Sequence, residues 1–353
     1  MSDNPRSLDS PDASGGQGPS PALELRRMIF GHVISQIVAT VATLGLADEL
    51  SRGPRSSDDL ARTTGADPDA LARLLRASTG LGLFVEVGRG EFALSPVGEW
   101  LRSDGPSLRQ LAIAMAGPGH WRSLERLSDV IATGRPAPPD VLGMSLWDYY
   151  RHNPEERGAF ATAMGYISAV VADEVVAHFD VSGFRRIIDV GGSQGILLAR
   201  LLEASPHATG VLFDLPEIVA EANQHLRRHG VDDRVETVAG DFFSEVPSGG
   251  DLYLLKHILH DWDDRRAARI LERCHAAGGA GHTLIVVERL LGPSADPVAH
   301  VADVLMLAMF GGRERTQAEY ESLLEDGGYR LARVVPLSMF ALLEAHAHQA
   351  GQA

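Results

Sequence analysis

The spacing of hydrophobic residues predicts a long helix near the start of the chain. Between Leu23 and Leu50, apolar residues recur every three or four positions, at Ile34, Ile37, Val38, Val41 and Leu44. The apolar stripe covers more than half of the helix circumference. A stripe this wide is typical of a helix buried against another element or another subunit.

Signals for helix starts follow this segment. Ser56 stands three residues before Asp59 in the spacing of a capping box, and Asp67 precedes Pro68, which suits the first turn of a helix. These signals predict two short helices, the second ending near Gly80. The runs FVEV and EFAL around GRG predict a hairpin over residues 84–94. The order helix, helix, hairpin indicates a winged-helix-like domain.

From Phe184 onward the pattern changes to short apolar or β-branched runs separated by helical stretches. The runs are RRIIDVGG, TGVLFDL, RVETVAGDFF, DLYLLKHI and HTLIVVERL. Strands that alternate with helices predict an α/β fold with a mostly parallel, doubly wound (Rossmann-like) sheet. Residues 330–346 predict an antiparallel hairpin at the edge of this sheet.

The predicted organisation has four parts. Residues 1–20 form a polar, disordered tail, and residues 21–105 form the winged-helix-like domain. Residues 106–180 form a helical connecting region with a loop at 134–140, which contributes to a substrate pocket. The sheet domain covers residues 181–353.

Composition narrows the possible partners. The formal net charge of −15 disfavours nucleic acid and anionic membranes as the main partners. A winged helix can bind DNA, but residues 56–104 contain five arginines and eight acids, a net charge of −3 (5 − 8). The single cysteine, Cys274, cannot form an internal disulfide, and the N-terminal segment lacks the apolar core of a signal peptide. We therefore expect a cytoplasmic protein.

A glycine-rich turn, Gly191–Gly195, follows the first strand of the sheet domain. Such a turn aims backbone N–H groups at a ligand, although the pattern G-x-G-x-x-G fits poorly because its first position is Val190. Asp214 ends the second strand, where a carboxylate can bind two ribose hydroxyls. Asp241 and Phe242 follow the third, where an acid and a ring can hold an adenine. The alternative is an ordinary strand-to-helix turn with solvated acids.

The segment LLKHILHDWDD, residues 254–264, concentrates titratable groups. It holds Lys256, the only lysine of the chain, beside two histidines and three aspartates. The segment follows a predicted strand, so we expect it at the crevice where doubly wound sheets bind ligands. A compact ammonium and a planar guanidinium are not interchangeable at a tight site. Chance is the alternative explanation for the lysine.

Six motifs together resemble a known family. DVGGSQG, FDLP, GDFF, LLKHILHDWDD, VVERLL and GGRERT, in this order and spacing, resemble the S-adenosylmethionine-dependent O-methyltransferases of the plant caffeate and bacterial polyketide type. The resemblance covers residues 25–345 and implies a homodimer with a winged-helix-like dimerisation domain. One departure is Ser193, where many members have a third consecutive glycine.

The resemblance also implies residues that hold S-adenosylmethionine. They are Gly191 at the amino-acid end, Asp214 at the ribose, Asp241 and Phe242 at the adenine, Lys256, and Ser168 at the methionyl part. Taken without the resemblance, Ser168 is an ordinary helical serine.

The catalytic residues are likewise implied by the resemblance. His260 matches the family's general base, Glu288 and Glu314 match the acids that flank it, and Asp261 matches a position near the methyl donor and acceptor. A sulfonium is an excellent leaving group, so the enzyme has to deprotonate the acceptor hydroxyl and align it. An imidazole with a pKa of about 6.5 suits removal of a proton from a phenol with a pKa of about 10.

Alternatives stay open for the neighbouring residues. His257 competes with His260 and is expected on the opposite side of the strand, against a helix. A helix cap is the alternative for Asp261, whereas Asp263 and Asp264 are expected to begin the following helix. No cluster has metal-ligand spacing, so no metal is expected.

The predicted substrate wall consists of residues that can mould around a flat ring. They are Met164, Leu305, Met309 and Phe310, with Trp121 and Trp147 as weaker candidates and a plain core as the alternative. The sequence thus predicts a cytoplasmic O-methyltransferase for a hydroxylated aromatic natural-product intermediate. One alternative is a same-fold enzyme for hydroxylation, decarboxylation or pericyclic chemistry. Another is a winged-helix regulator that senses a small molecule.

Overall fold

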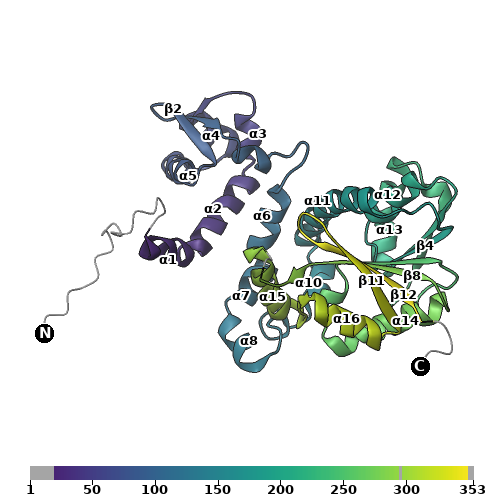
Figure 1. Ribbon diagram of the computed structural model, residues 1–353. Coiled ribbons are helices and arrows are strands. Elements are labelled where there is room, and N and C mark those ends of the chain that lie inside the picture. Colours follow the sequence, from purple (N-terminus) through teal and green to yellow (C-terminus); the bar gives the residue numbers. More distant parts are fainter. Residues whose placement is uncertain (1–19, 294–295, 349–353) are drawn as a thin grey trace, which may run out of the picture. The chain divides into compact units, whose positions relative to one another are not determined.

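The computed structural model describes residues 20–293 and 296–348 (Figure 1). The chain divides into two compact units between Gly117 and Pro118. The sequence predicts a boundary after residue 105 instead. The difference comes from helix α6 (Arg109–Ala116), which packs along α2 (Gly31–Thr43) and so belongs to the first unit.

The first unit is mostly helical. Its other elements are α1 (Pro21–Ile29), α3 (Leu46–Leu50), β1 (Arg55–Ser56), α4 (Ser57–Thr64), α5 (Pro68–Gly80), β2 (Phe84–Gly88), β3 (Glu91–Leu94) and the 3₁₀ helix η1 (Gly98–Leu101). The single helix predicted over residues 23–50 is wrong, because the segment forms three helices. The chain turns at Phe30, and Gly45 adopts a left-handed conformation with φ of 66° that no helix interior tolerates.

The helix–helix–hairpin order predicted after residue 56 is confirmed. The Ser56 side chain caps α4 by accepting from the N–H of Asp59, and the Asp67 side chain caps α5 by accepting from that of Ala70. Strands β2 and β3 form the hairpin, and β1 joins its other edge in the order β1-β3-β2. The hydrophobic core beneath these elements includes Leu46, Leu60, Leu75, Phe84 and Phe92.

The second unit opens with five helices, followed by alternating strands and helices. The helices are α7 (Pro118–Leu124), α8 (Leu127–Thr133), α9 (Pro138–Leu142), α10 (Leu146–His152) and α11 (Pro154–His178). The loop predicted at residues 134–140 is therefore shorter than expected. Helix α9 begins inside it, because a proline fits the first helical turn.

The sheet of the second unit is built from the predicted strands. The elements are β4 (Arg186–Val190), α12 (Ile196–Ala204), β5 (Thr209–Asp214), α13 (Pro216–Arg228), η2 (Asp232–Arg234), β6 (Val235–Ala239), β7 (Leu252–Lys256), η3 (Leu259–Asp261), α14 (Asp264–Gly278), β8 (Thr283–Glu288), β9 (Leu290–Leu291), α15 (Pro297–Phe310), β10 (Arg315–Thr316), α16 (Gln317–Asp326), β11 (Tyr329–Pro336) and β12 (Ala341–Ala347). The seven-stranded sheet has the order β11-β12-β8-β7-β4-β5-β6.

The strand order reverses at β4. Strand β4 pairs in parallel with β5 on one side and with β7 on the other, so the chain winds outward in both directions from this pair. Ligands of doubly wound sheets bind at the carboxyl ends of the strands where the order reverses. The predicted hairpin at the edge is confirmed, since β12 and β11 add antiparallel to β8.

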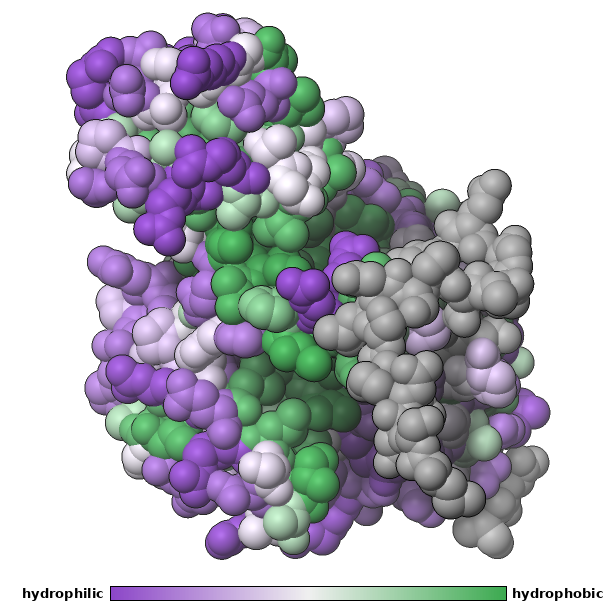
Figure 2. Space-filling model, turned by 90° about the vertical axis from the view of Figure 1, so that its left-hand side faces the viewer, coloured by the Kyte–Doolittle hydropathy of each residue, from purple (hydrophilic) through white to green (hydrophobic). Residues whose placement is uncertain are grey.

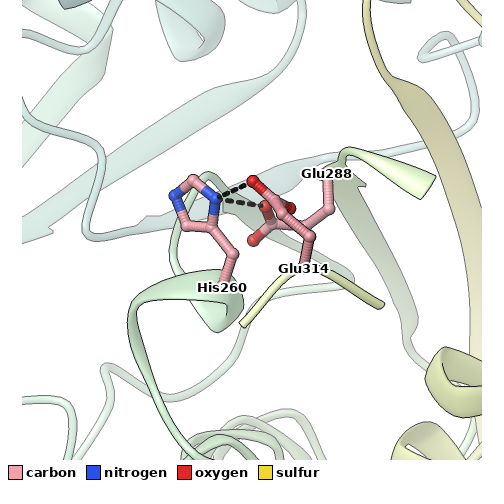
Figure 3. Close-up of side chains that lie close together, drawn as sticks. All are labelled: His260, Glu288 and Glu314. Atoms are coloured by element: carbon pink, nitrogen blue, oxygen red, sulfur yellow. Dashed lines mark hydrogen bonds and ion pairs between the residues drawn. The ribbon is translucent and has the colours of Figure 1, made fainter. Parts of the chain in front are cut away.

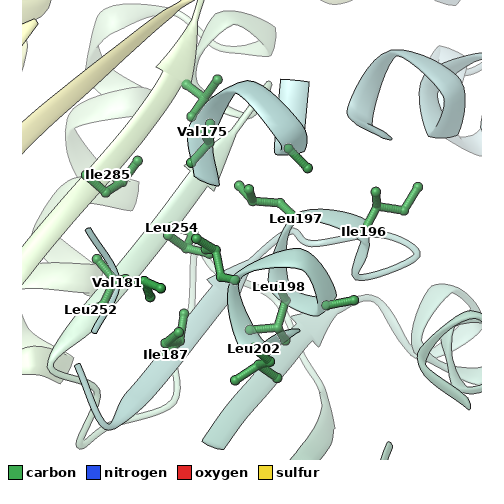
Figure 4. Close-up of a cluster of buried hydrophobic side chains, with 14 of the residues drawn as sticks. Val175, Val181, Ile187, Ile196, Leu197, Leu198, Leu202, Leu252, Leu254 and Ile285 are labelled. Carbon is green, nitrogen blue, oxygen red and sulfur yellow. The ribbon is translucent and has the colours of Figure 1, made fainter. Parts of the chain in front are cut away.

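Two apolar cores cover the two faces of the sheet, because successive strand residues point to opposite sides. On one face Ile187, Leu254 and Ile285 pack against α11 and α12 (Figure 4). On the other face Ile188 and Leu255 pack with residues of α14 and α16. The strands are therefore fixed from both sides, and their carboxyl ends form a firm base for the segments that follow them.

Helix α11 is the one helix among the described residues that is long and apolar enough to cross a membrane, with a mean hydropathy of 1.4 in its most apolar window. It packs against α12 and contributes Val171, Ala172 and Val175 to the core of the second unit. These contacts are those of a core helix.

Candidate active site

The glycine turn after β4 has the backbone geometry that its sequence predicts. Gly191 and Gly195 have φ angles of 70° and 73°, in the left-handed region that glycine adopts without strain. Ser193, where the resemblance expects a third glycine, also has a positive φ of 52°. A Cβ atom on Gly192 would lie 2.5 Å from the carboxylate of Asp189, so this position has no room for a side chain.

Asp214 at the end of β5 holds the glycine turn in place. Its Oδ2 atom accepts a hydrogen bond of 2.8 Å from the N–H of Ser193, and its Oδ1 atom accepts one of 2.7 Å from the N–H of Leu215. The first bond offsets the strain at Ser193. Burial raises the pKa of Asp214, and the two N–H donors oppose that rise. Each oxygen keeps a second lone pair with which a ribose hydroxyl can be bound.

Asp241 and Phe242 follow β6, as predicted. The Oδ1 atom of Asp241 accepts from the N–H of Phe243 at 2.9 Å, while the carboxylate itself is exposed. The ring of Phe242 lies beside the glycine turn, because a Cβ atom on Gly191 would be 3.7 Å from its Cε1 atom. The rings of Phe242 and Trp262 meet edge to face. The structure thus brings these predicted cofactor residues to one place.

Helix α11 closes another side of the turn. A Cβ atom on Gly165 would lie 3.2 Å from Oε1 of Gln194, so the helix backbone contacts the turn directly. Ser168 is buried on the same helix one turn later, and Met164 is half-buried beside Gly165.

Lys256 is the last residue of β7 and lies on the side of the site toward β4 and β8. Burial lowers the pKa of its ammonium, and the carboxylates of Asp189 and Glu288 oppose this. Burial likewise raises the pKa of Asp189 to about 7, against the influence of Lys256. The only lysine of the chain therefore balances buried acids at the carboxyl ends of adjacent strands.

His260 lies in η3, shortly after β7, and faces three carboxylates, those of Asp261, Glu288 and Glu314. Its Nδ1 atom is 3.0 Å from Oε1 of Glu314 and 3.6 Å from Oε2 of Glu288, as Figure 3 shows. Its Nε2 atom is 3.6 Å from Oδ1 of Asp261. The two ring nitrogens thus have different surroundings: two glutamates face Nδ1, and Asp261 flanks Nε2.

The acids around His260 determine its charge. Burial alone would lower its pKa, but the carboxylates of Glu288, Asp261 and Glu314 outweigh burial and raise the pKa to about 10. Burial raises the pKa of Glu288, and it raises that of Asp261 to about 7. Without a ligand, the surrounding acids therefore favour the protonated form of the ring.

Three further residues hold the two glutamates. Oε1 of Glu288 accepts 2.9 Å hydrogen bonds from the N–H groups of Ile258 and Leu259. The N–H of Glu314 donates to Oδ1 of Asp303 on α15 at 2.9 Å. The second oxygens of both glutamates are buried and have no hydrogen-bond partner among the described residues.

Sequence reasoning missed Arg315, Gly312 and Asp303, which support this cluster. The Arg315 guanidinium is fully buried and donates to backbone carbonyls on both sides of His260. The signal that could have found it is its place beside Glu314 in GGRERT. Asp303 stands in an apolar helix, and nothing in its local pattern points to Glu314.

The alternatives for the neighbours of His260 are now decided. His257 has a positive φ of 54° and packs its ring against Phe340, with centroids 4.2 Å apart, so the expected contact with a helix is wrong. Asp263 caps α14 by accepting from the N–H of Arg266, and Asp264 is the first residue of that helix, as predicted. The cap alternative for Asp261 is therefore wrong.

The predicted substrate wall is only partly assembled. Phe310 stacks on Trp147, with ring centroids 5.0 Å apart. Leu305 is partly buried and packs against the same hydrophobic cluster. Met309 is buried together with Leu146 and Tyr150, which favours the core alternative for this residue. Met164 belongs to a different helix, α11, and Trp121 is half-buried on α7.

Ligand-type atoms of His260, Glu288 and Glu314 all lie within 4.8 Å of one another. The sequence spacing predicts no such group, because the three residues come from separate segments. One oxygen of Glu288 is already bound by two N–H groups, and His260 binds Glu314 directly. The cluster is thus a hydrogen-bonded imidazole between acids, and the absence of a metal stays a prediction.

The arrangement fits S-adenosylmethionine. The Phe242 ring lies beside the glycine turn, and acids at the ends of β5 and β6 can bind ribose and base. The buried carboxylates of Asp189, Asp261 and Glu288, near the carboxyl ends of β4, β7 and β8, favour a positive charge beside them. A sulfonium with a nucleoside meets each of these requirements.

Comparisons with known proteins agree. The family model of the O-methyltransferase domain matches residues 124–330, and that of the O-methyltransferase dimerisation domain matches residues 27–104. The chain is 39% identical over 328 residues to O-demethylpuromycin-O-methyltransferase of Streptomyces alboniger, covering 90% of this chain and 87% of that protein. It is 35% identical to 8-amino-8-demethylriboflavin N,N-dimethyltransferase of Streptomyces davaonensis, over 88% of this chain and 91% of that protein.

Solved structures show the same fold. An O-methyltransferase from neocarzinostatin biosynthesis, in complex with S-adenosylmethionine and 2-hydroxy-5-methyl naphthoic acid, superposes with a TM-score of 0.80 at 33% identity. The match covers 89% of this chain and 96% of that one. The chain therefore belongs to the family of S-adenosylmethionine-dependent O-methyltransferases whose catalytic domain follows an O-methyltransferase dimerisation domain.

Proposed function

We propose that this enzyme methylates a hydroxyl group of an aromatic small molecule, an intermediate of natural-product biosynthesis, with His260 as the general base. The observation that carries the proposal is the hydrogen bond between His260 Nδ1 and Glu314 at the carboxyl ends of the parallel strands. S-adenosylmethionine supplies the methyl group as an activated sulfonium. The residues of the chain have to bind it, align the acceptor and remove a proton.

The orientation of the His260 ring supports its role as the base. With Nδ1 donating to Glu314, a neutral ring has its free lone pair on Nε2, which can accept a proton from a hydroxyl. Glu288 and Glu314 then stabilise the imidazolium, as an acid does in a hydrolase triad. The surrounding acids favour the protonated ring, whereas the base must be neutral. A cationic donor nearby favours the neutral ring, since like charges lower the pKa of an imidazolium.

The cofactor residues are proposed from the positions described above. Gly191 and Ser168 would lie at the amino-acid part, Asp214 at the ribose, and Asp241 with Phe242 at the adenine. Lys256 would neutralise Asp189 and Glu288 beneath the site.

The acceptor is proposed to be a flat ring, because aromatic side chains gather around α10 and α15. The rings of Trp147 and Phe310 are stacked, and those of Tyr150 and Phe160 are stacked with centroids 5.1 Å apart. Aromatic faces of this kind favour aromatic partners. The relative with a naphthoic acid bound has an aromatic ligand of this class.

We propose that the enzyme forms a homodimer through α1 and α2. Large apolar side chains on these helices are exposed, among them Leu25, Met28, Ile29 and Phe30. Figure 2 shows hydrophobic residues gathered on the face of the molecule to which α1 contributes. Such a surface marks a protein interface, and it lies in the part of the chain that matches the dimerisation model.

The buried, unpaired thiol of Cys274 suits the proposed cytoplasmic location.

An amino group is the second candidate acceptor, because one relative is named as an N,N-dimethyltransferase. The retained trio of His260, Glu288 and Glu314 favours a hydroxyl, which needs a base, and disfavours a non-methylating reaction. Incubation with S-adenosylmethionine and matched phenols and anilines tests this choice. We expect S-adenosylhomocysteine and a gain of one methyl mass with phenols. Methylation of anilines alone would contradict the proposal.

A further inference from the structure

The loop that carries His260 is held from two opposite sides. We propose that Arg315 is a positioning residue for His260, which fixes the imidazole by binding the backbone carbonyls of its loop while Glu288 binds the amides. This inference rests on the proposed role of His260 as the base. It concerns the placement of the ring, which can be measured without turnover.

The carbonyl side of the loop is bound by the segment that leads into β10. Arg315 donates from Nη1 to the carbonyl of Leu259 at 3.0 Å and from Nη2 to that of Trp262 at 2.9 Å. The N–H of Arg313 donates to the carbonyl of His260 itself at 2.8 Å. The carbonyls of Leu259, His260 and Trp262 are thus anchored to one segment.

The amide side of the same loop is bound by Glu288. Its Oε1 atom accepts from the N–H groups of Ile258 and Leu259. Leu259 is therefore gripped at both ends of its backbone, by a buried carboxylate and by a buried guanidinium. Because the N–H and the C=O of Leu259 both have hydrogen-bond partners, this segment has little freedom to move. A fixed position suits a neighbouring histidine that has to accept a proton from a substrate.

Glycine is required where the two segments meet. A Cβ atom on Gly312 would lie 2.1 Å from the carbonyl oxygen of His260 and 2.4 Å from the carbonyl carbon of Asp261. The backbone before β10 therefore lies directly on the loop. A side chain at this position would push the loop away without removing any charge.

Strand β10 couples the ring and its loop. Glu314 and Arg315 are consecutive, and the first binds the ring while the second binds the loop backbone. Arg315 pairs with Leu290 of β9, which begins two residues after Glu288. The register of this short parallel pair thus sets both glutamates and the histidine relative to one another.

The test replaces Arg315 by lysine, a single-point donor that cannot reach both carbonyls. We expect kcat to fall about 10²-fold, with the dissociation constant for S-adenosylmethionine changed by less than about threefold, because only the base is displaced. The matched control Arg333→Lys changes an exposed pair with Glu344 and should be neutral.

A second readout separates positioning from a general loss of stability. NMR titration of ¹³C-labelled histidines gives the pKa of His260 in the ligand-free protein. The groups that face this ring are Glu288, Asp261, Glu314 and His257. In Arg315→Lys the ring should move away from the acids, so its pKa and the acidic limb of the pH–rate profile should shift downward. A structural role alone would lower the melting temperature and leave both unchanged.

Two further variants, of which Asp264→Asn is the milder, keep the test decisive if Arg315→Lys does not fold. Gly312→Ala should lower kcat and the pKa of His260 in the same way, whereas Gly158→Ala, where a Cβ meets open space, should not. Asp264→Asn loosens Arg315 from its exposed partner and should give a smaller effect of the same sign. Wild-type kcat and an unchanged His260 pKa in the folded variants would overturn the proposal. Wild-type turnover in His260→Ala would instead overturn the proposed function.

Discussion

The Nδ1 atom of His260 lies 3.0 Å from Oε1 of Glu314, although the two residues are 54 positions apart in the chain. The contact joins the turn after β7 to the segment before β10. In the neutral ring, a donor at Nδ1 would leave the lone pair of Nε2 for the proposed removal of a substrate proton. The chemistry of the site therefore depends on how these two segments are held together.

Asp214 is predicted to be required mainly for binding of the methyl donor. Asp214→Asn replaces one acceptor oxygen by an NH₂ group. This donor would face another donor, the N–H of Ser193 or Leu215, and the substitution also removes the negative charge at the proposed ribose position. We expect the dissociation constant for S-adenosylmethionine to rise at least about tenfold, which corresponds to about 1.4 kcal/mol. Isothermal titration calorimetry measures it. The exposed Asp233→Asn is the control, and equal affinities for the two variants would refute this role.

The charge of His260 should make the ligand-free enzyme less stable at high pH. Its pKa is raised in the folded state to about 10, so the stability it adds is complete below its unfolded pKa of about 6.5. This stability is lost as the pH rises from about 6.5 through about 10. Chemical denaturation across this range should show a steeper fall in the free energy of unfolding for the wild type than for His260→Gln. Parallel curves would show that the ring is not an imidazolium in the ligand-free protein.

Metal removal should not affect turnover. The ligand-type atoms of His260, Glu288 and Glu314 could in principle hold a cation, but the ring already binds Glu314 directly. Dialysis against a chelator is therefore expected to leave kcat within about twofold of its starting value, because the proposed proton acceptor is the imidazole and not a metal-bound water. Loss of activity that a divalent cation restores would contradict this picture.

A charge on α1 should separate the subunits of the proposed dimer. Met28 is 74% exposed, and burial of an unpaired carboxylate at an interface is costly, so Met28→Asp should shift the protein toward the monomer. Sedimentation equilibrium reports the change. Val87→Asp, at a 54% exposed position on the hairpin, serves as the control. A stable dimer in the Met28 variant would place the interface elsewhere.

Several elements of both units could be predicted from local sequence. Asp67-Pro68 marks a helix start through a side-chain cap, and the run ending in Asp214 marks a strand whose carboxyl end meets the glycine turn. These signals are local because they depend on backbone hydrogen bonds and on periodic burial. The parallel pairing of β4, β5 and β7 then follows from the alternation of strands and helices.

Other features depend on tertiary contacts and left no local signal. The helix break at Gly45 was not predicted, because the apolar stripe continues past this residue. A glycine in a helix interior and a glycine at a helix end cannot be told apart from the local sequence. The division of the chain after Gly117 depends on how α6 packs along α2. Arg315 contacts residues more than fifty positions away in the sequence. The residue type alone does not reveal whether an arginine is buried.

The most direct test of the account is turnover by His260→Ala, measured with a methylated phenol as the product and with donor affinity determined in parallel. We expect kcat to fall by about 10²–10⁴-fold, since the base is removed, while the dissociation constant for S-adenosylmethionine stays close to that of the wild type. His152→Ala, at an exposed position on α10, should be neutral. A His260 variant that binds the donor and still methylates the phenol at the wild-type rate would show that another group removes the proton.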